Sequence, residues 1–313
     1  KAMFDNTTGA NNVSIGSSSL ENNTTAASNT AVGFCSMKFN TTGASNTAIG
    51  TSALADNTTA NNNTAVGNLS ATGNTTGTNN STLGFQSFFT NTTGGGNVAI
   101  GVNSLYANTT ASNNTAIGLS ALEANTTGID NTAVGALSLD ANTTGSQNIA
   151  IGKCSLTANT TASNNVAAGH RSMETNTTGS ANVAIGEQTL RYNTTGICNT
   201  AVGSNAGLNN TTGGCNTGIG RNALLANTTG NLNVAIGGNS LDANTTASNN
   251  TAVGYSSMST NTTGSRNVAM GRNALEYNLT GDDNSAFGYG ALSSNTTGLT
   301  NVAMGRDALK TNT

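Results

Sequence analysis

The stretch that decides the fold is residues 97–118, NVAIGVNSLYANTTASNNTAIG, which hold one 17-residue unit and the start of the next. The unit repeats along the chain without insertion or deletion. A Gly stands at position 16 and at every seventeenth position to Gly305, and an Asn stands four residues before each of these glycines. A second Asn follows each Gly by seven residues, from Asn23 to Asn312. Spacing this strict is typical of a solenoid, in which one inserted residue would shift every later side chain out of its column.

The composition of the unit favours strands over helices. Asn, Thr, Val and Gly are weak helix formers, and the unit is too short for a pair of helices. Triplets such as Val98-Ala99-Ile100 place β-branched residues two apart, which suits a short strand. We therefore predict an all-β fold, a parallel β-solenoid (β-roll) of about 18 stacked 17-residue coils, as a single repeat array over residues 1–313. Neighbouring strands would lie about 4.8 Å apart.

Alternation along each strand predicts which side chains enter the coil. We expect the apolar residues on either side of the central Ala to point inward, where they meet the Leu four residues after the Gly. For two neighbouring repeats this predicted core consists of Val98, Ile100, Leu105, Ile117 and Leu122. The central Ala and the following Gly would then form an outward strip of small residues, against which neighbouring chains could pack closely.

The fixed polar columns predict two ladders along the solenoid. Stacked Asn side chains can exchange amide hydrogen bonds with the coils above and below and can cap the turns. The Gly at the end of each strand is expected to take a positive φ at the corner. The predicted ladder and corner residues of the two repeats are Asn97, Gly101, Asn108, Asn114, Gly118 and Asn125. The Gly of Asn-Thr-Thr-Gly is often replaced by Ala. A small side chain therefore matters more in that column than a left-handed backbone conformation does.

Charge and hydropathy exclude several classes of partner. Only 7% of the residues are charged, 4% are aromatic, and the formal net charge is −3. Such a chain offers no electrostatic attraction for nucleic acid or an anionic membrane surface, and it lacks the long apolar run that membrane insertion needs. Each coil has few large apolar side chains to offset the entropy of ordering its backbone, so we expect association with other copies. Both ends fall inside a repeat, which predicts an array cut from a longer chain.

The residues predict no enzyme, cofactor or metal site. The single His, His170, lies in a variable column, and the acidic residues are scattered. The turns carry Asn and Thr rather than the Asp ladders of calcium-binding β-rolls. Asn-Thr-Thr matches the N-glycosylation acceptor pattern, but a turn-and-ladder role is the favoured interpretation. Cys198 and Cys215 are a candidate disulfide, since they stack in adjacent coils at a suitable Cα separation, although their parallel Cβ directions disfavour the bond.

Variable outward columns are where recognition of a partner could reside. A candidate contact surface contains two aromatic residues and three arginines that share one column: Phe85, Phe89, Arg221, Arg272 and Arg306. The simpler interpretation is that these residues are exposed to solvent and contact no partner.

The repeat resembles those of known fibre proteins. Asn131-Thr132-Ala133-Val134-Gly135 and the Asn-Thr-Thr-Gly at residues 142–145 are similar to repeats of bacteriophage-type tail-fibre proteins. They also resemble the head repeats of trimeric autotransporter adhesins, although those repeats are shorter. The resemblance covers the whole chain. It implies a parallel β-roll, usually an intertwined or side-packed homotrimer, outside the cell or on a cell or virion surface. It further implies a shaft that spaces or presents a receptor-binding tip, with other copies as partners and a host receptor or glycan as a further one.

Two alternatives come from other classes of protein. One is a polymeric extracellular coat filament without a receptor role. The other is an ice-binding β-solenoid, because flat arrays of Thr can order water. The mixed Thr and Val column at the start of each strand is expected to face inward, which would leave one outward Thr per coil from Asn-Thr-Thr. Thermal hysteresis would distinguish the ice-binding alternative from the fibre.

Overall fold

The computed structural model of the chain describes residues 1–311 and divides it into two compact units, residues 1–161 and 162–313. Each unit contains nine short strands, and no helix occurs among the described residues. The strands of the first unit are β1 Val13–Ile15, β2 Thr30–Val32, β3 Thr47–Ile49, β4 Thr64–Val66, β5 Ser81–Leu83, β6 Val98–Ile100, β7 Thr115–Ile117, β8 Thr132–Val134 and β9 Ile149–Ile151. Those of the second unit are β10 Val166–Ala168, β11 Val183–Ile185, β12 Thr200–Val202, β13 Thr217–Ile219, β14 Val234–Ile236, β15 Thr251–Val253, β16 Val268–Met270, β17 Ser285–Phe287 and β18 Val302–Met304.

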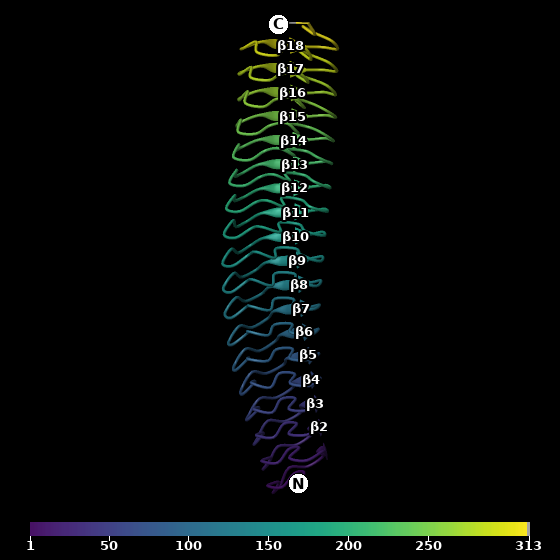
Figure 1. Cartoon of the computed structure of the whole chain (residues 1–313), viewed down its shortest axis with the longest axis vertical. Coiled ribbons are helices and arrows are strands. Elements are labelled where there is room, and N and C mark those ends of the chain that lie inside the picture. Colours follow the sequence, from purple (N-terminus) through teal and green to yellow (C-terminus); the bar gives the residue numbers. More distant parts are fainter. Residues whose placement is uncertain (312–313) are drawn as a thin grey trace. The chain divides into compact units, whose positions relative to one another are not determined.

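Within each unit, strands that follow one another in the sequence pair in parallel with a constant register. Val98 lies opposite Thr115 and Ala99 opposite Ala116, so each residue pairs with the residue 17 positions later. Figure 1 shows the strands of each unit lying one above the next, with one turn of chain between them. The all-β, parallel β-solenoid fold predicted from the repeat is therefore confirmed, with one coil per 17 residues.

Positive φ angles make the corners of each coil. Gly101 ends strand β6 with a φ of 133°, and a Cβ atom there would overlap the carbonyl group of Gly118 in the next coil. Asn103, Leu105 and Asn113 then take the left-handed conformation, with φ between 50° and 60°. This conformation costs an ordinary residue roughly 1–2 kcal/mol. The backbone N–H of Leu105 still donates to the Ala121 carbonyl at 3.0 Å, so the corner keeps its bonds to the next coil.

The prediction of which strand residues enter the coil is wrong. Ala99 is fully buried, whereas Ile100 and Ile117 are each 37% exposed and Val98 is only half-buried. The interior is narrow and is already occupied by Leu105, so only a small side chain fits opposite it. The structure does bury Leu105 and Leu122 completely. Alternation along the strand was predicted correctly, but the larger side chains face outward.

The predicted outward strip of Ala and Gly is wrong for the same reason. Ala occupies the middle of most strands and is 0–3% exposed wherever it stands there. In most turns it shares the interior with a buried Leu or Met and with the small Ser or Ala that precedes that residue. In the second unit this core contains Ala235, Leu241, Ala252, Met258 and Ala269 among others. Small residues thus line the interior of the coil rather than a contact between chains.

The two Asn columns form hydrogen-bonded ladders inside the coils. Asn97 Oδ1 accepts from the backbone N–H of Asn114 at 2.9 Å, and Asn97 Nδ2 donates to the Ala111 carbonyl at 3.0 Å. In the second ladder, Asn108 Nδ2 donates to Asn91 Oδ1 at 2.9 Å, and Asn125 Nδ2 donates to Asn108 Oδ1 at 3.1 Å. Because these side chains are fully buried, the ladders supply partners for polar groups that would otherwise be costly to bury.

Candidate functional site

The outward side of the strands forms a regular surface along each unit. We call it the strand face: the first and third residues of each strand. Thr, Val, Ser and Ile occupy the first position, and Ile, Val, Leu, Met, Phe or Ala the third, so no charged residue occurs in it. Large apolar side chains remain exposed in it, such as Ile49 at 40% and Ile151 at 46% in the first unit and Ile185 at 43% in the second. Large apolar side chains that stay exposed in a regular, uncharged row of this kind are typical of a site of interaction in soluble proteins.

The side chains on the other outward columns are mostly polar and solvated. His170 lies beside Glu187, with 3.8 Å between Nδ1 and Oε1, and both side chains are about half exposed. Glu174 accepts from Arg191 Nε at 2.6 Å and lies 3.6 Å from Arg171 Nε. The contacts of Glu174 are ion pairs within and between coils, and His170 lies beside a carboxylate rather than beside a hydroxyl or thiol nucleophile.

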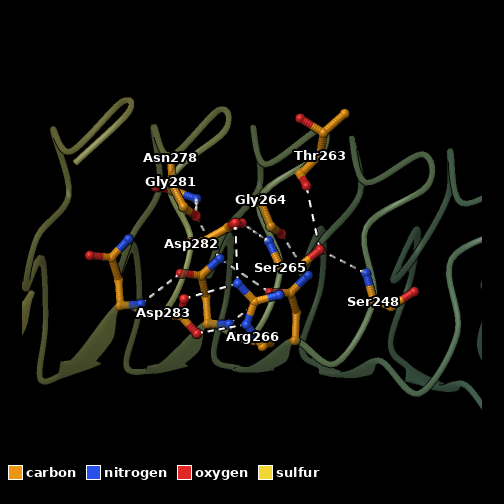
Figure 2. Close-up of polar contacts among 12 residues, drawn as sticks. Ser248, Thr263, Gly264, Ser265, Arg266, Asn278, Gly281, Asp282 and Asp283 are labelled. Atoms are coloured by element: carbon orange, nitrogen blue, oxygen red, sulfur yellow. Dashed lines mark hydrogen bonds and ion pairs between the residues drawn. The ribbon is translucent and has the colours of Figure 1, made fainter. Parts of the chain in front are cut away.

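A group of three charges joins two neighbouring coils of the second unit. Figure 2 shows Arg266 directed at Asp282 and Asp283. Its Nε donates to Asp283 Oδ1 at 2.7 Å, and its Nη2 donates to Asp283 Oδ2 at 2.9 Å and to Asp282 Oδ2 at 3.3 Å. The backbone N–H of Ser265 donates to Asp282 Oδ1 at 2.7 Å. Arg266 holds the pKa of Asp283 below its ordinary value through its hydrogen bonds. Because Arg266 lies one coil before Asp282 and Asp283, the group links two neighbouring coils.

Three carboxyl groups have a raised pKa because burial disfavours their charged form. Burial raises the pKa of Asp140 to about 6, against the lowering effect of nearby backbone N–H groups. Asp242 occupies the same column of the second unit, and its pKa is raised by burial as well. The pKa of Asp56 is raised for the same reason. Each of these carboxyl groups lies on a separate coil, and no two of them form a facing pair of the kind used in acid–base catalysis.

The candidate contact residues are outward but do not form one patch. In the first unit, Phe85 is 47% exposed, and Phe89 is half-buried and stacks on Tyr106 with ring centroids 5.3 Å apart. In the second unit, Arg272 lies over the ring of Tyr255 at 5.6 Å, and Arg306 lies over Tyr289 at 5.5 Å. Arg221 is exposed. The sequence shows no periodic signal for the tyrosines that partner Arg272 and Arg306, because that column varies freely.

The two stacked cysteines are unpaired, and the Asn-Thr-Thr motifs form part of the ladders. Cys198 and Cys215 are exposed and free, so the candidate disulfide is not formed. The Asn of each Asn-Thr-Thr motif belongs to a buried ladder, as Asn108 and Asn125 illustrate. The first Thr also bonds to the next coil, since Thr109 Oγ1 donates to the Thr126 carbonyl at 3.2 Å. A glycan on these Asn side chains would break the ladder.

Searches for a metal site and for a membrane span gave no candidates. Within residues 1–311, no three His, Cys, Asp or Glu side chains gather closely enough to hold a metal ion. The same residues contain no helix that is long and apolar enough to cross a membrane. Comparison with known proteins found no matching family model and no curated protein of significantly similar sequence.

Proposed function

We propose that the chain is a structural or adhesive shaft segment of a fibre outside the cell or on a cell or virion surface. In this proposal, the strand faces of several copies, three in the simplest arrangement, pack against one another. The shaft would space or present a receptor-binding tip, and a host receptor or glycan would be its further partner. Neither catalysis nor a cofactor has a part in this function.

The uncharged strand face is the observation that carries the proposal. Complete burial of an Ile side chain contributes about 1.5–3 kcal/mol. Covering the 37% of Ile100 that is exposed would therefore contribute about 0.6–1.1 kcal/mol. Each coil repeats this contribution, so the gain grows with the number of coils in contact. A long array thus suits a permanent assembly more than a short one does.

The test is the mass of the particle in solution. Light scattering on the wild-type chain should give a multiple of 30.9 kDa, and a trimer is expected. Ile100→Lys combined with Ile117→Lys places two charges in the strand face and should shift the mass toward that of one chain. Val102→Lys combined with Leu119→Lys is the matched control, because these exposed residues lie just beyond the strand face on the same coils. Equal masses for the two double variants, or a monomeric wild type, would refute the proposal.

Ice binding remains as a second candidate because one observation favours it. The first strand residue points outward, contrary to expectation, so Thr30, Thr47 and Thr64 lie on the strand face beside the apolar third residues. Such a surface presents hydroxyl and methyl groups in rows about 4.8 Å apart. Thermal hysteresis of the wild-type chain that is lost in Thr47→Lys would favour this function. A multimer without thermal hysteresis would favour the fibre.

A further inference from the structure

Two of the four cysteines stand in the same column of neighbouring coils. Cys198 and Cys215 belong to the second unit, and both side chains are exposed and free. The other two, Cys35 and Cys154, are half-buried and do not lie in neighbouring coils. Among residues 1–311, the chain therefore presents one pair of neighbouring thiols that solvent can reach.

The backbone gives the two exposed cysteines the same orientation. Each has a φ of 57°. The N–H of Cys198 donates to the Ser180 carbonyl at 3.1 Å, and the N–H of Cys215 donates to the Ile197 carbonyl at 2.9 Å. Matching conformation and matching bonds to the preceding coil make the two Cα–Cβ bonds parallel, about 4.8 Å apart. A disulfide needs Cβ atoms about 3.5–4.5 Å apart, so the coil spacing holds these sulfurs too far apart for an unstrained bond.

The same spacing suits a metal ion held between two thiolates in a line. A bond between a metal ion and a thiolate sulfur is about 2.3 Å long, so two collinear bonds span about 4.6 Å. This span is close to the ~4.8 Å between neighbouring coils. Two parallel Cys side chains in the same rotamer would place their sulfurs at that distance, with the ion between them.

The surroundings of the two thiols favour a soft cation of low coordination number. Ala181 and Leu232 stand before and after them in the column, and neither can be a ligand. No third His, Cys, Asp or Glu joins the pair in the part of the chain that the structure describes. Calcium and magnesium need several oxygen ligands, and a structural zinc site needs four ligands. Thiolates alone select soft ions such as Cu(I), for which two sulfurs in a line are a complete set of ligands.

We propose that Cys198 and Cys215 together bind one Cu(I) ion between two neighbouring coils. Each thiol loses its proton to solvent as its sulfur–copper bond forms. Binding therefore releases two protons and leaves a bis-thiolate complex with one net negative charge. No electron is transferred, because the metal arrives as Cu(I). The bound ion would link the two coils, and it is independent of the proposed shaft because neither cysteine belongs to the strand face.

The experiment titrates the reduced full chain with Cu(I) under nitrogen, with bicinchoninate as the coloured competing chelator. Cys198→Ser and Cys215→Ser each remove one ligand. Ser suits this backbone, since Ser28 and Ser45 occupy the same column with φ of 61° and 59°. X-ray absorption at the copper edge then identifies the atoms bound to the metal.

The matched control is the double variant Cys35→Ser with Cys154→Ser, which removes two thiols that are not neighbours. It tests whether any two cysteines of the chain would suffice. The control should change the affinity for Cu(I) less than twofold.

We expect the wild-type chain to withdraw one Cu(I) from the chelator, and each single variant to lower the affinity at least 100-fold. The absorption spectrum should show two sulfur neighbours and no nitrogen or oxygen neighbour. Failure to withdraw Cu(I), unchanged affinity in either single variant, or an equal loss in the control would overturn the inference. One Cu(I) per two chains would also overturn it, because the ion would then lie between copies. A wild-type multimer that binds no copper would refute the metal site and leave the self-associating shaft standing.

Discussion

Replacing Asn108 by Leu should locally open the solenoid. Three hydrogen bonds of the buried ladder would be lost: from Asn108 Nδ2 to Asn91 Oδ1 at 2.9 Å and to the Ala111 carbonyl at 3.0 Å, and from Asn125 Nδ2 to Asn108 Oδ1 at 3.1 Å. Each such bond contributes about 0.5–1.5 kcal/mol. The change should therefore cost about 3 kcal/mol, and more if the freed N–H of Asn125 stays buried without a partner.

Amide hydrogen exchange measured by mass spectrometry is the appropriate assay, because long repeat arrays do not unfold as one two-state unit. A cost of about 3 kcal/mol corresponds to amide exchange roughly 100-fold faster in peptides that cover residues 91–125. Asn68→Leu is the control, since Asn68 is exposed and Leu119 stands in the same column; its effect should stay within twofold. If Asn108→Leu exchanged as slowly as the wild type, the ladder would contribute nothing to stability, and the reasoning would be refuted.

Three further predictions concern packing, pH and the thiols. Leu105→Ala should lower the free energy of unfolding by about 2–5 kcal/mol because Leu105 is fully buried, whereas Leu119→Ala, at an exposed site, should change it by about 0.5 kcal/mol or less; chemical denaturation of both variants tests this. Burial raises the pKa of Asp140 to about 6, so its contribution to stability is complete below pH 4, the ordinary range of a free Asp, and is lost as the pH rises through 6. Asp140→Asn should therefore raise the melting temperature at pH 8 more than at pH 4, and an equal effect at both would contradict this. Cys198 and Cys215 should react with a maleimide without denaturant, because both are exposed and free, and unreactive thiols that reduction restores would instead reveal a disulfide.

The repeat spacing was sufficient to predict that the coils stack in register. A Gly and two Asn residues at fixed positions in every 17 predicted stacked coils, Asn ladders and a positive φ at Gly101, all of which the structure contains. These features depend on residue i lying over residue i+17, and the sequence displays that relation directly.

The direction of the strand side chains could not be inferred from hydrophobicity alone. Ile100 is more apolar than Ala99, but the volume of the coil interior decides which one enters. The volume depends on the corners, where Leu105 takes a φ of 50° although Leu rarely adopts it. Side-chain preference does not predict such a conformation, because the surrounding coils impose it.

Methionine oxidation tests most directly that the strand face points outward and that other copies cover it. Met270 is the third residue of strand β16 and is 42% exposed, whereas Met258 is buried in the coil interior. Oxidation of the monomeric chain by peroxide, followed by peptide mass spectrometry, should modify Met270 much faster than Met258. In the assembled chain, Met270 should become protected while Met258 stays unmodified. Equal oxidation of the two residues in the monomer, or a Met270 that reacts as fast in the assembly as in the monomer, would contradict this arrangement.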